Sequence, residues 1–145
     1  MYQHILIPTD GSLLSKAAVD NALALARALN ARVTVVTVVT PFHAFAGVAD
    51  ELVGTRELYD KQAKQAAARL LSDAERNAKE EGVQCTAVQL QHEHPFKAII
   101  ETATKSGCDL IAMASHGRRG MAGIVLGSET SKVLTHSSIP VLVYR

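Results

Sequence analysis

Four glycines and two arginines lie in one stretch of this chain, Ala114-Ser115-His116-Gly117-Arg118-Arg119-Gly120-Met121-Ala122-Gly123-Ile124-Val125-Leu126-Gly127-Ser128-Glu129-Thr130. The hydrophobic run 109–114 before the glycines indicates a buried strand, and 128–136 after them has the pattern of a helix. A glycine-rich connection from a strand to a helix exposes backbone N–H groups, and the helix N-terminus adds partial positive charge. The stretch therefore predicts an anion site, typically for phosphate. The alternative is a plain loop whose glycines only make turns.

The composition fits one soluble globular domain that spans residues 1–145. Of the 145 residues, 48% are hydrophobic and 20% are charged, and the formal net charge of +1 argues against a broad nucleic-acid surface. No apolar run approaches the roughly 20 residues of a membrane span, and the N-terminus has no signal-peptide pattern. The two cysteines, Cys85 and Cys108, fit buried thiols better than a disulfide. We therefore expect a cytoplasmic protein that binds neither nucleic acid nor membrane.

Hydrophobic periodicity predicts five strands that alternate strictly with four helices. The expected strands are 4–8, 33–39, 83–90, 109–114 and 139–144. The expected helices run from an N-cap at Ser12 to Asn30, over 57–81, from Pro95 to just before Gly107, and over 128–136. The segment 40–54 has little periodicity, so it is a lid, an interaction loop, or a loop packed on its own domain. The alternation predicts an α/β fold with an open parallel sheet and helices on both faces.

Two loops with notable chemistry follow the first and fourth expected strands. The first is Thr9-Asp10-Gly11-Ser12, and the second is the glycine-rich stretch. In an open α/β sheet, ligands bind beyond the carboxyl ends of the strands at the point where the winding reverses. If the first and fourth strands are neighbours, both loops face one crevice.

The motifs of several other enzyme and cofactor classes are missing. Strand one is followed by Pro-Thr-Asp-Gly-Ser instead of Gly-x-Gly-x-x-Gly, which argues against a standard NAD site, and no P-loop occurs. The serine of Gly127-Ser128 lacks the second glycine of a hydrolase elbow. His92-Glu93-His94 has no further metal ligand at a clear spacing. We therefore predict no protein-bound metal and no catalytic residue, since no nucleophile–base pair is evident.

Three segments together resemble the universal stress protein family over essentially the whole chain. They are Ile-Leu-Ile-Pro-Thr-Asp-Gly-Ser at 5–12, Ser-His-Gly-Arg-Arg-Gly through Leu-Gly-Ser at 115–128, and Ile-Pro-Val-Leu-Val at 139–143. The resemblance implies a small cytoplasmic protein with a Rossmann-like fold of the adenine-nucleotide alpha-hydrolase type and strand order 3-2-1-4-5. It also implies a dimer. One branch of the family binds ATP and another does not.

The ATP-binding branch carries Gly-x2-Gly-x9-Gly-Ser/Thr, and this chain departs from that motif at one position. Gly117 and Gly127-Ser128 match, with nine residues between the two glycines, and Ala114 replaces the first glycine. If that position needs a positive φ, alanine costs on the order of 1 kcal/mol. If the ligand touches the α-carbon, the added methyl group intrudes on it.

The resemblance assigns the phosphate end of the ligand to the glycine-rich stretch. The backbone of four residues would hold the phosphates: Gly117, Gly127, Ser128 and Glu129. The Glu129 carboxylate suits the helix dipole, but it repels phosphates unless the side chain points away. Arg118 would close over the phosphates, or it is a solvated loop arginine.

The resemblance assigns the ribose and the base to other strand ends. Asp10, with Pro8 and Thr9, would line the ribose and phosphate end. The backbone of Val38 would meet the adenine edge, and Met113 and Ala114 would form the floor. The implied ligand is ATP or another adenine nucleotide, with a Mg²⁺ ion near Asp10.

These features lead to one main hypothesis and two alternatives. The main hypothesis is a stress-response module that binds an adenine nucleotide and thereby regulates contact with an unidentified protein partner. Ala114 motivates the first alternative, a member that has lost nucleotide binding and acts as a partner-binding dimer. The second alternative is a weak ATPase. The last strand is expected at a sheet edge, and with the resemblance it predicts a homodimer through Val141, Leu142, Val143 and Tyr144.

Overall fold

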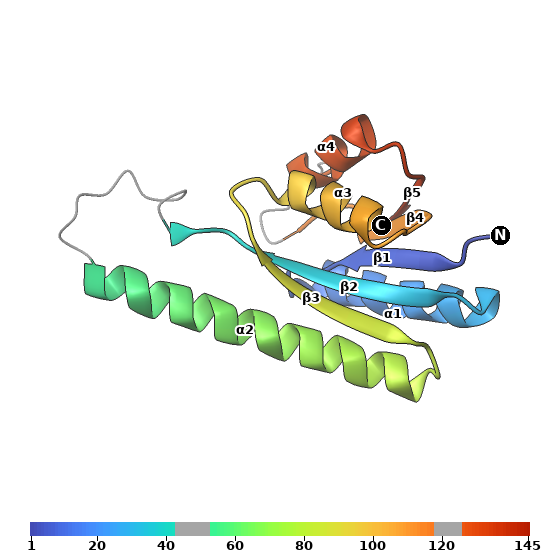
Figure 1. Cartoon of the computed structure of the whole chain (residues 1–145), viewed down its shortest axis with the longest axis horizontal. Helices are drawn as coiled ribbons and strands as arrows, with labels where there is room; N and C mark the ends of the chain where they lie inside the picture. Colours follow the sequence, from blue (N-terminus) through green and yellow to red (C-terminus); the bar gives the residue numbers. More distant parts are fainter. Residues whose placement is uncertain (43–52, 118–125) are drawn as a thin grey trace.

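The computed structural model describes residues 1–42, 53–117 and 126–145 (Figure 1). Its strands form one parallel sheet in the order β3-β2-β1-β4-β5. The strands are β1 (His4–Pro8), β2 (Arg32–Val39), β3 (Cys85–Gln91), β4 (Leu110–Ala114) and β5 (Val141–Tyr144). The helices are α1 (Leu13–Leu29), α2 (Val53–Glu80), α3 (Pro95–Lys105) and α4 (Ser128–His136). The predicted fold class and strand order are confirmed.

Some boundaries differ from the expected ones. Helix α2 begins at Val53, so Val53 and Gly54 belong to a helix and not to the expected 40–54 loop. Residues 43–52 of that loop lie outside the described residues, and its predicted role stays a prediction. Strand β5 begins at Val141 because Pro140 has no N–H group to donate to the sheet.

Hydrophobic side chains pack on both faces of the sheet. On one face, Leu23 of α1 and Leu71 of α2 join the cluster around Ile5 and Ile7. On the other face, Ile99 of α3 and Val133 of α4 pack with Leu6, Val36 and Ile111. Figure 1 shows the same two layers of helices, with α3 and α4 on the opposite side of the strands from α2. This double cover explains why Ile5-Leu6-Ile7 is apolar without alternation.

The ends of α1 are formed by its own neighbouring residues, as the sequence predicted. The Ser12 hydroxyl accepts a hydrogen bond from Ser15 N at 3.2 Å. Asn30 ends the helix in the left-handed region with φ 53°, and its N–H donates to Arg27 O at 3.2 Å. Ser12 therefore satisfies one of the free N–H groups that an external anion would otherwise use.

The winding of the sheet reverses between β1 and β4. Strand β1 pairs with β2 on one side and with β4 on the other, all in parallel. The loops that follow β1 and β4 therefore leave the carboxyl ends of neighbouring strands, on the same side of the molecule. This is the position at which open α/β sheets bind ligands. Among the described residues, no helix is both long and apolar enough to cross a membrane.

His4 is buried at the end of the sheet where the strands begin, opposite to these loops. Its Nε2 atom lies 2.8 Å from Thr34 Oγ1, and its side chain is 7% exposed. Burial, reinforced by the nearby Arg32 charge, lowers the pKa of His4 from 6.5, although Asp109 opposes the shift. The folded chain therefore holds His4 neutral at pH values where the unfolded chain protonates it.

We expect the folded chain to lose stability as the pH falls from 7.5 to 5.5. His4 of the unfolded chain takes up a proton near pH 6.5, whereas the lower pKa in the folded chain resists it, so protons favour unfolding. Urea-unfolding midpoints measured at several pH values check this. His4→Gln can still hydrogen-bond Thr34 but cannot titrate, so its midpoint should change less with pH. An equal change in both proteins would contradict the role of His4.

Candidate functional site

The loop after β1 is fixed by hydrogen bonds around Asp10. Thr9 N donates to Val36 O at 2.9 Å, which continues the β1–β2 pairing by one residue. The Ser15 hydroxyl lies 2.7 Å from Thr9 Oγ1 and accepts from Asp10 N at 3.1 Å. Ser12 N donates to Asp10 Oδ1 at 3.0 Å. The Asp10 carboxylate is therefore held in one place at the end of β1.

Gly117 lies directly against that carboxylate. A Cβ atom placed on Gly117 would overlap Oδ2 of Asp10. The φ of Gly117 is not positive, so the glycine is needed for space and not for backbone conformation. The structure thus brings the loops after β1 and β4 into contact, as the crevice hypothesis predicted.

Gly127 extends this contact to the N-terminus of α4. A Cβ atom on Gly127 would lie 3.2 Å from Ser115 O and 3.3 Å from His116 Cα. Gly127 N donates to Ser115 O at 2.6 Å. As the N-cap of α4, Gly127 has no side chain to accept from the N–H groups of the first turn. Among the described residues, no N-cap side chain covers the N-terminus of α4, and its partial positive charge lies beside the Asp10–Gly117 contact.

The end of β4 is buried. Met113 and Ala114 are 6% and 7% exposed. Thr130 Oγ1, from the first turn of α4, donates to Ala114 O at 2.9 Å. Ala114 lies in the strand, and its φ is not positive, so the conformational cost foreseen for an alanine here does not arise. The methyl group of Ala114 can therefore hinder a ligand only through the space that it occupies.

Strand β2 extends beyond the end of β1. Pro8 pairs with Val36, whose carbonyl faces β1, and backbone groups of alternate residues point to the same side. Val38 is two residues further on, so its N–H and C=O groups point to the side where β1 has already ended. Val39 O points the other way and accepts from His92 N at 3.1 Å. The Val38 backbone therefore faces the crevice.

Ser15, Thr130 and His116 are residues that the sequence analysis missed. Ser115 Oγ lies 2.9 Å from His116 Nδ1, which is a serine–histidine hydrogen bond. Ser115 is only 2% exposed, so its hydroxyl is not accessible to a substrate. His116 Nε2 is buried and has no hydrogen-bond partner among the described residues. The only signal for the two hydroxyl residues was their place in the first turn of a helix.

Two other candidates have different outcomes. Arg118 lies outside the described residues, so its predicted role is untested. Within residues 1–42, 53–117 and 126–145, no group of three or more histidine, cysteine or acidic side chains could hold a metal ion. The turn 92–94 instead lines an open groove of about 550 Å³ beyond the ends of β2 and β3. The other residues along this groove are Pro41, Phe42, Arg56, Asp60 and Gln91.

Strand β5 lies at the edge of the sheet, as predicted. Its inner side pairs with β4, because Ile111 N donates to Pro140 O and Ser115 N donates to Tyr144 O. Since backbone direction alternates, Val141 and Val143 point their N–H and C=O groups outward. This edge is open to a further strand among the described residues.

Comparison with known proteins relates the whole chain to one family. The model described as "Universal stress protein family" matches residues 1–145. The universal stress protein MJ0531 of Methanocaldococcus jannaschii is 34% identical over 145 residues, which cover 100% of this chain and 83% of that relative. The universal stress protein UspA from Lactobacillus plantarum has a TM-score of 0.82 at 26% identity, covering 99% and 98% of the two chains. A universal stress protein solved in complex with cAMP has a TM-score of 0.72 at 26% identity, covering 99% and 97%.

Proposed function

Because the chain belongs to the universal stress protein family, we propose that it binds an adenine nucleotide, with ATP as the first candidate, between the loops after β1 and β4. The observation that carries the proposal is the N-terminus of α4, which has no side-chain cap and lies beside Gly117 and Asp10. Backbone N–H groups at such a helix end favour a phosphate. The relative solved with cAMP supports an adenine nucleotide as the ligand class.

Within this proposal, each wall of the crevice meets one part of the ligand. The N–H groups of Ser128 and Glu129 hold the phosphates, because the N–H of Gly127 is already bonded to Ser115 O. Asp10 meets the ribose and phosphate end and orients a Mg²⁺ ion that accompanies the phosphates. The outward backbone of Val38 meets the edge of the adenine, which presents both donors and acceptors.

We also propose what the bound nucleotide does. The chain acts as a regulatory module in the cytoplasm, as a homodimer through β5 whose contact with a protein partner depends on the nucleotide. The two described cysteines are free, which fits a reducing compartment. The proposed role is binding, and the burial of the serine in the Ser115–His116 pair argues only against a covalent intermediate on that serine.

The test is to purify the chain without added nucleotide, denature it, and separate the supernatant by ion exchange with detection at 260 nm. An adenine-nucleotide peak equimolar with the protein would support the proposal and give the number of phosphates. An empty supernatant together with a flat ATP titration would refute it. A steady release of phosphate that disappears in Asp10→Ala would indicate ATP hydrolysis instead.

Ala114 favours a second candidate, a partner-binding dimer without a nucleotide. Its buried methyl group lies at the end of β4, where the motif of the ATP-binding branch has a glycine. If the methyl group blocks the ligand, Ala114→Gly should gain ATP affinity by at least about tenfold, comparable to relief of a 1–3 kcal/mol overpacking cost. Calorimetric titration of both proteins checks this, and Ala112→Gly, a change on the same buried strand, is the matched control. Equal ATP affinity in the wild type and Ala114→Gly would exclude the methyl group as the obstacle.

A further inference from the structure

Helix α3 has no side-chain capping hydrogen bond from its own N-cap residue. His94 occupies the N-cap position and makes no side-chain capping hydrogen bond. Pro95 follows and has no N–H group to donate. The first backbone donor of the helix is therefore Phe96 N, and it needs an acceptor from elsewhere.

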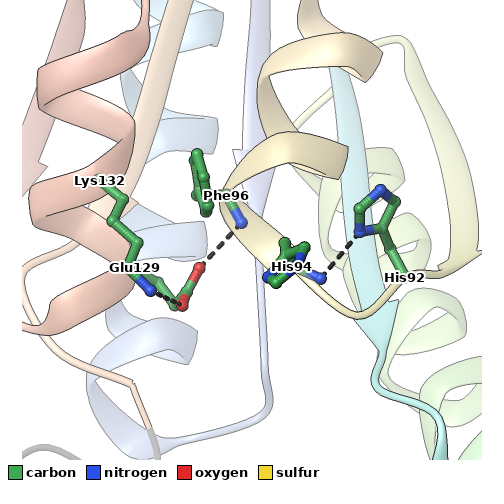
Figure 2. Close-up of polar contacts among 5 residues, drawn as sticks. All are labelled: His92, His94, Phe96, Glu129 and Lys132. Carbon is green, nitrogen blue, oxygen red and sulfur yellow. Dashed lines mark hydrogen bonds and ion pairs between the residues drawn. The ribbon is translucent and has the colours of Figure 1, made fainter. Parts of the chain in front are cut away.

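Glu129 of α4 supplies that acceptor (Figure 2). Its Oε2 atom accepts from Phe96 N at 2.9 Å, and its Oε1 atom lies 3.3 Å from Lys132 Nζ. The Phe96 ring also contacts α4, with Lys132 Nζ 5.5 Å and the His136 ring 5.3 Å from its centre. Lys132 and Glu129 are both well exposed, so the ion pair itself contributes little. The bond to Phe96 N is what directs the carboxylate toward α3.

This direction matters because Glu129 lies in the first turn of α4. A carboxylate at that position also fits the N-terminus of its own helix, where it is stabilised by the dipole. There it would compete with a phosphate for the same N–H groups and repel it. Bound to Phe96 N, the carboxylate leaves the N-terminus of α4 open. An anion at α4 and the Glu129–Phe96 hydrogen bond therefore favour each other.

We propose that Glu129 is a positioning residue through which a phosphate bound at α4 strengthens the cap of α3. The inference rests on the proposed nucleotide function. It adds that the bound phosphate affects a second surface, the open groove. The turn before α3 is held by His94 N, which donates to His92 Nδ1 at 2.8 Å (Figure 2). That turn forms one wall of the open groove that Phe42, Arg56 and Asp60 also line. Nucleotide binding thus acts on the groove, and by linkage a ligand that orders the groove strengthens nucleotide binding.

Hydrogen exchange of the Phe96 amide, followed by ¹⁵N NMR on the full chain with and without saturating ATP, tests the coupling. In the wild type, ATP should slow exchange at Phe96 by about two- to fivefold, the size of a typical charge effect at a helix end. Amides at the C-terminal end of α3, such as Lys105, report any general stabilisation by the ligand. Bound ATP with unchanged exchange at Phe96, relative to Lys105, would overturn the inference alone. A wild-type chain that binds no ATP would overturn the proposed function as well.

Two variants separate positioning from a merely structural cap. Glu129→Gln keeps an oxygen that can accept from Phe96 N and removes the charge. At ATP concentrations that saturate this variant, ATP should no longer slow the exchange at Phe96. Glu101→Gln is the matched control, an exposed charge removed from α3 itself, and it should behave like the wild type. Equal slowing at Phe96 in Glu129→Gln and in the wild type would overturn the proposal.

Discussion

Gly117→Ala should lose nucleotide binding by at least about tenfold while the chain stays folded. The new methyl group overlaps Oδ2 of the Asp10 carboxylate, so this side chain must turn away and give up its hydrogen bond from Ser12 N. Overpacking of this kind costs about 1–3 kcal/mol, and each 1.4 kcal/mol lost from binding is a factor of ten. Calorimetric titration with ATP measures the affinity, and thermal unfolding measures the stability.

Two further glycines provide the comparison. Gly127→Ala places its methyl group 3.2 Å from Ser115 O and 3.3 Å from His116 Cα, which are backbone atoms, so it should also weaken ATP binding. Gly107→Ala meets no atom within 4 Å, but φ is +71° there, so it should lower stability and leave ATP affinity unchanged. If Gly117→Ala binds ATP as the wild type does, the Asp10–Gly117 contact is not part of the site.

Val143→Pro should convert a dimeric wild type into a monomer. The N–H of Val143 points away from β4, so proline removes a donor from the open edge and leaves the β4–β5 hydrogen bonds in place. Two copies of β5 that pair across a two-fold axis contain the substitution twice, which doubles its effect. Sedimentation of both proteins at micromolar concentration checks the result.

Val143→Thr is the matched control, because it keeps the N–H group, the β-branched shape and the strand preference of valine. It should remain dimeric. A monomeric wild type would show that β5 does not form the dimer. A dimeric Val143→Pro variant would show that the copies associate through another surface.

The sequence alone determined the elements and their order, because the signals for these are local. Helical spacing of apolar residues and the Ser12 cap predicted α1 together with its N-cap, and 128–136 was predicted to the residue as α4. Uninterrupted apolar runs predicted strands covered on both faces. The alternation of these elements, with the family resemblance, was enough for the sheet order and for placing Asp10, Gly117 and Gly127 at one end of the strands.

Contacts between distant segments were decided by the tertiary structure. Only the fold brings Gly117 against Asp10, so the sequence could assign that glycine to a motif but could not say what limits its size. The sequence left open whether Ala114 needs a positive φ, and the structure shows that it does not, because the position lies inside β4. The only sequence signal for Ser15 was its place in the first turn of a helix, and a buried serine there has the same sequence pattern as an exposed one.

Glu129 shows most clearly which features the sequence predicted and which the tertiary structure decided. The sequence identified a carboxylate in the first turn of the helix that we propose binds phosphate, and the condition that this carboxylate must point away. Its partner, Phe96 N, lies 33 positions earlier in the chain, and a backbone N–H has no residue type to reveal it. The direction of a charged side chain depends on which donors the packed helices bring within reach. Residue types and spacing therefore determined the fold and predicted the class of site, and the packing of α3 against α4 decided where the Glu129 carboxylate lies.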